Sequence, residues 1–330
     1  ELRKKALKSI DDTTFYPSKG KERIRSMIET RPDWCVSRQR VWGVPLPIFI
    51  SKKDGKPLVD EKLFDNIAKI YEKEGSDCWF DDDPQRFLGK NYKKEDYDKL
   101  TDIVEVWFDS GSTHSFVLEK RKDLKWPASM YLEGSDQHRG WFHSSLLESC
   151  GTRGKAPFES ILSHGFVVDG KGLKMSKSLG NVISPEEILK KYGADILRIW
   201  VASSNYAEDL RIDHEILNQH ADSYRKIRNT FRYILGNIND VHEKISYEDL
   251  DIQSFNELEQ LMLFKLFEFN ARFKQYFNEY NFHNLYKDLL NFCTTDLSAF
   301  YFDIRKDCLY CDPSNSKKRN SVIILLNIIL

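Results

Sequence analysis

The second half of the chain has apolar side chains at helical spacing. They recur every three or four residues from position 216 onward, and residues 258–280 and 283–305 repeat the pattern with Phe and Tyr at the core positions. This period predicts amphipathic helices that pack together through one face. The stretch 321–330 (SVIILLNIIL) is apolar but too short to cross a membrane, so we expect it to be part of a buried helix. The pattern therefore predicts an all-α bundle.

The middle of the chain shows a different pattern, in which short apolar runs alternate with polar clusters. A helical stretch over 141–150 lies between two of the runs, and this alternation of strands and helices predicts an α/β sheet. Ligands of α/β proteins lie at the carboxyl ends of strands, so the polar clusters can converge on one site. The runs of strand composition are 103–108, 130–132 and 161–168, and the polar clusters that follow them are 109–115, 133–139 and 169–178.

The first hundred residues have no such alternation. Residues 1–30 mix charged and apolar positions in a helical manner, with a break at 17–20. A Trp- and Arg-rich stretch over 33–50 ends in VPLPIFI, which predicts a strand, and residues 51–100 are rich in Lys and Asp, which is typical of a surface insertion. Further along, Ser184 followed by Pro and two acids predicts the start of a helix.

Composition and charge narrow the function classes. A length of 330 residues is typical of about two domains. Lys and Arg number 50 against 51 Asp and Glu, so any nucleic-acid site must be a local patch. No apolar segment of about 20 residues exists, which predicts no membrane span and a cytoplasmic protein. The chain begins without Met or a signal peptide and ends within an apolar pattern, so we expect a piece of a longer protein.

The cysteines and histidines predict no metal site. Six cysteines at irregular spacing favour a reducing compartment without disulfides. Cys308 and Cys311 form a single CxxC, and a zinc site would need a second pair, so packing thiols are the favoured interpretation. His138 and His143 are five positions apart and lack a third ligand nearby in the sequence.

The sharpest chemical signal is the stretch Lys174-Met175-Ser176-Lys177-Ser178, followed by Leu-Gly-Asn. Two lysines three positions apart, with hydroxyl groups between them, lie on a Gly-flanked turn after a predicted strand. Their ammonium groups can neutralise phosphate, and the serines and backbone N–H groups can add hydrogen bonds. Lysine suits a phosphate that gains charge during a reaction. The alternative is a solvated basic loop.

These residues resemble the class I aminoacyl-tRNA synthetases, whose signature loop is KMSKS. The resemblance covers nearly the whole chain, and WFDSGSTH and EGSDQHRGWF are closest to the isoleucine members of that family. The family's other signature, HIGH, is absent from the 330 residues, and no editing domain is found. The supporting stretches are 33–43 (DWCVSRQRVWG), 106–114 (VWFDSGSTH), 131–142 (YLEGSDQHRGWF), 163–166 (SHGF) and 192–198 (YGADILR).

The resemblance implies an α/β fold, the second half of a class I Rossmann-type catalytic domain with a connective insertion, followed by an all-α anticodon-binding bundle. The implied domains are a connective segment (1–50), a surface insertion (51–100), the catalytic half with the KMSKS loop (101–183), a stem-contact linker (184–215) and a truncated helical anticodon-binding domain (216–330).

The resemblance also implies an activity, in which isoleucine attacks ATP to give an adenylate and the isoleucyl group of that adenylate is then transferred to tRNA(Ile). The substrates would be isoleucine, ATP with Mg²⁺ and tRNA(Ile), and the protein would be a monomer. Whether the longer protein carries a C-terminal zinc module is left open. Lys177 and Lys174 would be catalytic. ATP would be bound by Lys174, Met175, Ser176, Lys177, Ser178, His164 and Gly165; the adenylate by Glu133, Gly134, Asp136, Gln137, Trp107 and Trp141; and tRNA by Arg38, Arg40, Arg225, Arg228 and Arg232.

Several of these roles have structural alternatives. The two tryptophans can be core side chains, His164 can be a core histidine, and Arg38 and Arg40 can form structural ion pairs. Because HIGH is absent, the alternative to a partial enzyme is a non-catalytic fragment that binds tRNA or protein. A nucleotidyltransferase with the same half-fold is a third interpretation.

Overall fold

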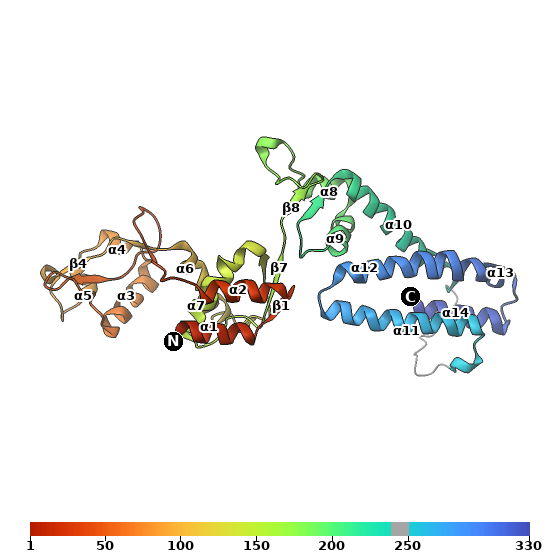
Figure 1. Cartoon of the computed structure of the whole chain (residues 1–330), viewed down its shortest axis with the longest axis horizontal. Coiled ribbons are helices and arrows are strands. Elements are labelled where there is room, and N and C mark those ends of the chain that lie inside the picture. Colours follow the sequence, from red (N-terminus) through yellow and green to blue (C-terminus); the bar gives the residue numbers. More distant parts are fainter. Residues whose placement is uncertain (239–250) are drawn as a thin grey trace. The chain divides into compact units, whose positions relative to one another are not determined.

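The computed structural model describes residues 1–238 and 251–330, which form two compact units, Glu1–Ser163 and His164–Leu330 (Figure 1). We refer to them as the N-terminal and C-terminal units and describe each separately. Among the described residues, no helix combines the length and the apolar character needed to cross a membrane.

The N-terminal unit is built on a three-stranded sheet whose order is β1-β7-β6. Strands β1 (Thr14–Tyr16) and β7 (Ser160–His164) run parallel, and β6 (Tyr131–Gly134) lies on the other side of β7. Helices α1 (Leu2–Asp11), α2 (Lys19–Glu29) and α7 (Trp141–Thr152) pack with the sheet around a shared core. That core contains Ile10, Phe15, Ile24, Phe142, Leu146 and Ile161, all buried.

A second core lies within the segment that was predicted to be a surface insertion. Strands β3 (Phe49–Ser51) and β4 (Tyr97–Lys99) pair antiparallel, preceded at β4 by the 3₁₀ turn η1 (Lys94–Asp96). Helices α3 (Glu61–Glu74), α4 (Cys78–Asp81) and α5 (Pro84–Leu88) pack with them around Trp79, which is fully buried. This segment is therefore a small module with its own apolar centre.

The link from this module to the sheet differs from the prediction for 103–108. Strand β5 (Ile103–Val104) pairs antiparallel with β2 (Ser37–Arg38), but the chain then turns into helix α6 (Val106–Gly111). The predicted strand through 108 is therefore wrong in its second half. A π-helical turn, η2 (His114–Leu118), follows α6, and a 3₁₀ turn, η3 (Ser135–His138), joins β6 to α7.

The C-terminal unit begins with a small parallel pair of strands and continues as helices. Strand β8 (Val167–Asp169) pairs with β9 (Leu210–Ile212), and helices α8 (Pro185–Tyr192) and α9 (Ala194–Ser203) lie between them in the sequence. The Ser184 hydroxyl accepts a hydrogen bond from the Glu187 backbone N–H, which confirms the predicted helix start. A core that includes Ile188, Trp200 and Leu217 joins these elements to helix α10 (His214–Asn237).

The remaining helices confirm the predicted bundle. The apolar end 321–330 lies in α14, where Val322, Leu325 and Leu326 are fully buried. The predicted architecture, α/β followed by all-α, is confirmed. The elements of this part are α10 (His214–Asn237), the 3₁₀ turn η6 (Ile252–Ser254), α11 (Glu257–Asn278), α12 (Phe282–Asn291), the π-helical segment η7 (Phe292–Phe302), α13 (Asp303–Cys311) and α14 (Lys317–Ile329), besides the 3₁₀ turn η4 (Lys177–Leu179) near the start of the unit.

Candidate active site

Helix α6 begins where it does because Glu105 caps it. The Glu105 carboxylate accepts a hydrogen bond from the Trp107 backbone N–H at 2.9 Å, and Glu105 itself has extended backbone angles. A capping side chain satisfies an N–H group that has no partner within the helix, so the strand ends at Val104. Arg38 lies 3.8 Å from the same carboxylate and donates hydrogen bonds to the Cys35 and Ser37 carbonyls. Arg38 is thus engaged within its own unit.

The predicted adenylate segment lies at the end of β6 and the start of α7. Gln137 accepts a hydrogen bond from the Trp141 backbone N–H at 2.9 Å, which caps α7, and its amide donates to Asp136 at 3.2 Å. Glu133 and Asp136 are exposed, whereas Gly134 is buried. Gln137 therefore has a structural role in the helix start, and the two carboxylates are accessible to a ligand.

Helices α6 and α7 bring together three of the predicted residues. The Trp141 indole N–H donates to the Ser110 carbonyl at 2.9 Å. A Cβ atom at Gly140 would lie 2.4 Å from Gln137 Oε1 and 3.0 Å from Trp107 Cη2, so the Trp107 ring lies directly against the α7 backbone. Trp107, Gln137 and Trp141 therefore converge.

Trp107 and Trp141 differ in how deeply their side chains are buried. Trp141 is half-buried and stacks on Tyr131, with ring centroids 4.0 Å apart and 1° between the planes. Trp107 is 42% exposed. One face of Trp141 is thus taken by the core, and Trp107 retains surface that a substrate side chain can contact.

The loop 174–178 of the C-terminal unit is fixed at its base by Asn181 and Asp169. The Asn181 side chain donates to Asp169 Oδ2 at 2.9 Å and to the Lys174 carbonyl at 3.3 Å, and it accepts from the Ser176 backbone N–H at 2.9 Å. Asp169 also accepts from two backbone N–H groups of the turn that follows β8. The Asn181 hydrogen bond and these backbone donors hold the pKa of Asp169 below its usual value.

The side chains of the same loop divide into anchored and exposed ones. Met175 is half-buried and packs on the core around Ile188. The Ser176 hydroxyl accepts from the Leu179 backbone N–H, while Lys174, Lys177 and Ser178 are exposed. The loop thus presents two ammonium groups on a backbone that is held in place.

His164 and Gly165 lie just before β8. The half-buried His164 ring is hydrogen-bonded through Nδ1 to the Gly165 carbonyl at 2.7 Å, so Nδ1 is the donor. A Cβ atom at Gly165 would lie 2.2 Å from the Glu208 carbonyl oxygen. Gly165 is therefore needed for close packing of two backbone segments.

The predicted tRNA-binding arginines differ in their surroundings. Arg225 pairs with Asp222 at 2.5 Å on the same helix, which leaves its guanidinium exposed but neutralised. Arg228 and Arg232 are exposed on α10, and Arg40 is exposed near β2. Arg232 also lines a groove of about 530 Å³ with Asn229, Tyr233, Gly236, Asn237 and Tyr310.

The sequence interpretation missed Asp169, Asn181 and Glu148. The first two stand on either side of the loop, and an Asp before a Gly-rich turn is a recognisable signal for a side chain that holds a turn. Glu148 lies in the predicted helical stretch 141–150, and both of its carboxylate oxygens are buried without a hydrogen-bond partner among the described residues. The signal in the sequence was that Glu148 is the only acid of this stretch.

The candidate metal ligands have other contacts. His138 Nδ1 is hydrogen-bonded to the Ser135 carbonyl, and His143 Nε2 accepts from the Arg31 guanidinium at 2.9 Å. The Cys308 thiol donates to Asp312 at 3.2 Å, and Cys311 is exposed. Within residues 1–238 and 251–330, no group of three or more His, Cys, Asp or Glu side chains is arranged to hold a metal ion.

Comparison with protein families gives two matches. Residues 1–213 match the family model described as tRNA synthetases class I (I, L, M and V), and residues 259–330 match the anticodon-binding domain of tRNA ligase. The chain is 77% identical over 329 residues to the isoleucine--tRNA ligase of Pelagibacter ubique, covering 100% of this chain and 36% of that protein. The corresponding enzyme of Mesorhizobium japonicum is 51% identical over 326 residues, covering 98% and 32%. The chain thus spans about a third of the length of these curated relatives.

Solved structures share the fold at low sequence identity. Methionyl-tRNA synthetase of Mycobacterium tuberculosis bound by methionyl-adenylate superposes with a TM-score of 0.65 at 14% identity, covering 99% of this chain and 57% of that one. The LeuRS-tRNA-LeuAMS ternary complex of Agrobacterium radiobacter gives a TM-score of 0.61 at 19% identity, covering 90% and 38%.

Proposed function

Because the chain belongs to the class I tRNA synthetases of the I, L, M and V group, we propose that it is part of an isoleucine–tRNA ligase. Its substrates would be isoleucine, ATP as the magnesium complex, and tRNA(Ile). The choice of isoleucine rests on the similarity to isoleucine--tRNA ligases along the whole chain. The observation that carries the proposal is the loop 174–178, whose backbone is held by Asn181 while both lysines remain exposed.

In the first proposed step, a carboxylate oxygen of isoleucine attacks the α-phosphorus of ATP. A bond forms between that oxygen and the α-phosphorus. The bond between the α-phosphorus and the oxygen that bridges it to the β-phosphate breaks, and pyrophosphate leaves with the extra negative charge. Lys177 and Lys174 would neutralise that charge as it develops. Ser176, Ser178, His164 and Gly165 belong to the same proposed ATP site.

The adenylate would lie against the end of β6. The exposed Glu133 and Asp136 carboxylates suit ribose hydroxyls or an ammonium group, and Gly134 and Gln137 line the same turn. Trp107 and Trp141 would form the walls for a branched aliphatic side chain. In the second step a terminal ribose hydroxyl of tRNA attacks the acyl carbon, and AMP leaves.

The helical bundle would hold the tRNA. Arg228 and Arg232 are the strongest candidates for phosphate contact, because Arg225 already has Asp222 as a partner. Arg40 and Arg38 are also proposed to bind tRNA. Arg38 is the weaker candidate, because its guanidinium already donates hydrogen bonds to the Cys35 and Ser37 carbonyls.

We propose that the protein is a cytoplasmic monomer. The free thiols of its six cysteines favour a reducing compartment.

The experiment uses a chimera in which this chain replaces the matching third of the Pelagibacter ubique enzyme, which is 77% identical to it. Isoleucine-dependent exchange between ATP and pyrophosphate is measured. We expect activity in the chimera and a loss of about 100-fold in Lys177→Ala. Lys190→Ala, which removes an exposed lysine of α8, is the matched control. An inactive but folded chimera, or an unchanged rate in Lys177→Ala, would contradict the proposal.

A further inference from the structure

The Glu148 carboxyl group lies at the contact between α7 and α6. A Cβ atom placed on Gly111 would lie 2.2 Å from Glu148 Oε1 and 2.9 Å from Ser144 Oγ. Only a glycine in α6 leaves the space that this carboxyl group fills. Gly111 of α6 and Glu148 of α7 are thus in close contact.

Helix α6 carries Trp107, so the same contact bears on the proposed side-chain pocket. At one end α6 is fixed by Glu105, and along its length by the Trp141 indole, which donates to the Ser110 carbonyl. Gly111 lies one residue after that carbonyl. The Glu148 contact therefore lies next to the point at which Trp141 is hydrogen-bonded to α6.

The Glu148 carboxyl group accepts no hydrogen bond from the residues that the structure describes. Both carboxylate oxygens are buried and unpartnered among the described residues, and Asp109 of α6 adds a second carboxylate nearby. Burial, with the Asp109 charge as a smaller cause, raises the pKa of Glu148 to about 8, and burial also raises the pKa of Asp109. The raised pKa favours the protonated form of the Glu148 carboxyl group at neutral pH.

Other charged groups line the cavity of about 690 Å³ to whose wall Glu148 belongs. Arg153 is held by Glu119 through two hydrogen bonds of 2.9 Å, and Arg31 by His143. The Nδ1 atom of buried His114 is hydrogen-bonded to the Gly111 carbonyl, and its Nε2 atom has no partner among the described residues. The remaining charged side chains of the lining are Arg3, from the start of α1, and Asp33.

We propose that Glu148 is a positioning residue for the isoleucine pocket: its fit against Gly111 sets the spacing of α6 and α7 and thereby the place of Trp107 beside Trp141. The inference rests on the proposed function, because it assigns these tryptophans to the substrate side chain. It adds a residue outside the motif stretches that carry the family resemblance.

The first test measures the KM for isoleucine and kcat of exchange in the chimera described above. Glu148→Ala removes the side chain that fills the contact, and we expect the KM for isoleucine to rise about 10-fold, with kcat and the KM for ATP changed less than about 2-fold. Glu148→Gln keeps the shape without a titrating proton and should restore the KM near pH 7. The exposed Glu95→Ala is the control. An unchanged KM in Glu148→Ala would overturn the inference while leaving the proposed function intact.

The second test needs no activity and uses the 330-residue chain itself. Ionisation of Glu148 places a charge at the α6 contact, so tryptophan emission should change with a midpoint near pH 8. The change should be absent in Glu148→Gln, whose side chain has no proton to lose in this pH range. Lack of the transition in the wild-type chain, or its persistence in Glu148→Gln, would overturn the inference whatever the chimera does.

Discussion

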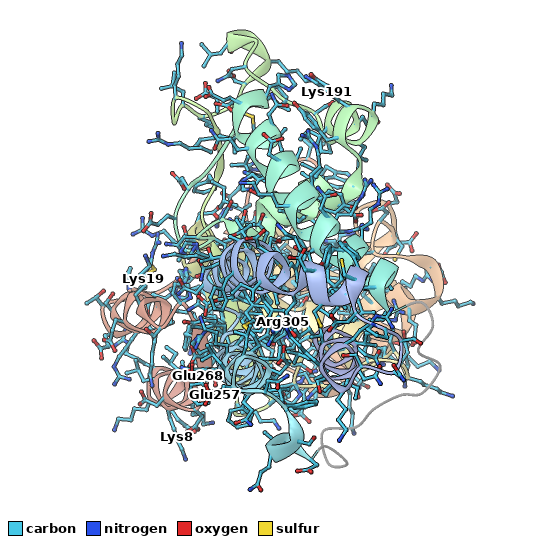
Figure 2. The ribbon with its side chains drawn as sticks, turned by 90° about the vertical axis from the view of Figure 1, so that its right-hand side faces the viewer. Lys8, Lys19, Lys191, Glu257, Glu268 and Arg305 are labelled. Carbon is cyan, nitrogen blue, oxygen red and sulfur yellow. The ribbon has the colours of Figure 1, made fainter. Side chains whose placement is uncertain are left out.

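Arg305 of α13 forms a two-pronged ion pair with Glu259 of α11. Arg305 Nε and a terminal guanidinium nitrogen donate to the two carboxylate oxygens at 2.7 and 2.9 Å, and the Tyr301 hydroxyl donates to one of them at 3.1 Å. Glu259 is fully buried. Glu257 and Glu268 on the same helix are exposed, and both are labelled with Arg305 in Figure 2. The buried Glu259 carboxylate thus accepts its hydrogen bonds from Arg305 and Tyr301 within the core of the helical bundle.

Removing Arg305 should destabilise the C-terminal unit strongly. In Arg305→Ala the buried Glu259 carboxylate loses its charge partner, which costs about 3–5 kcal/mol of unfolding free energy. Urea unfolding of the chain, followed by circular dichroism, measures this loss. Glu257→Ala on the exposed side of α11 should stay within about 0.5 kcal/mol of the parent chain. A loss below about 1 kcal/mol in Arg305→Ala would show that the pair is not buried as described.

Asn181 should matter for the reaction more than for stability. Its side chain ties Asp169, Lys174 and Ser176 together at the base of the loop, so Asn181→Ala should leave the lysines without a fixed backbone. We expect exchange by the chimera to slow about 10-fold, with little change in the melting temperature. Asn270→Ala, at an exposed position of α11, is the control. Equal rates for Asn181→Ala and the parent would contradict this role.

The helices and the loop lysines could be predicted from sequence because the signals are local. The period of 216–235 extends over most of α10, and Ser184-Pro185 fixes the start of α8 through a single side chain. The strand predicted over 103–108 failed for a local reason too, because Glu105 caps a helix in a stretch whose apolar composition favours a strand. Apolar composition alone does not distinguish short strands from short helices.

The other contacts could not be predicted, because they join residues distant in sequence. Glu148 is the only acid of 141–150, but it meets Gly111 only once α6 and α7 pack, and nothing in the sequence marks these two residues as a contact. Asn181 finds Asp169 only after the turn between them has closed. The role of Glu133 and Asp136 in binding the adenylate was predicted from the family resemblance. The structure shows that both side chains are exposed, which fits that role but does not test it.

The arginines of α10 should contribute unequally to tRNA binding. Each exposed guanidinium that contacts a phosphate releases about one counterion, so Arg228→Gln and Arg232→Gln should each flatten the plot of log affinity against log salt by about 1. Arg225→Gln should have a smaller effect because Asp222 already neutralises that side chain. Filter binding of tRNA(Ile) at several salt concentrations measures the slopes. Lys274→Gln on α11 is the control, and equal slopes for all four variants would refute the assignment.

His143 should make the N-terminal unit sensitive to acid. Burial, with the Arg31 charge as a smaller cause, lowers the pKa of His143 to about 4. The unfolded chain, with a histidine pKa near 6.5, then binds more protons than the folded chain between about pH 4 and 6.5. Stability must therefore fall as the pH drops through this window, by up to about 3 kcal/mol from this group. Melting temperatures are measured as a function of pH. The melting temperature of His143→Gln should not fall in this window, whereas that of His283→Gln, a variant at an exposed position, should fall as in the parent chain. The same fall in His143→Gln as in the parent would show that His143 is not buried in its neutral form.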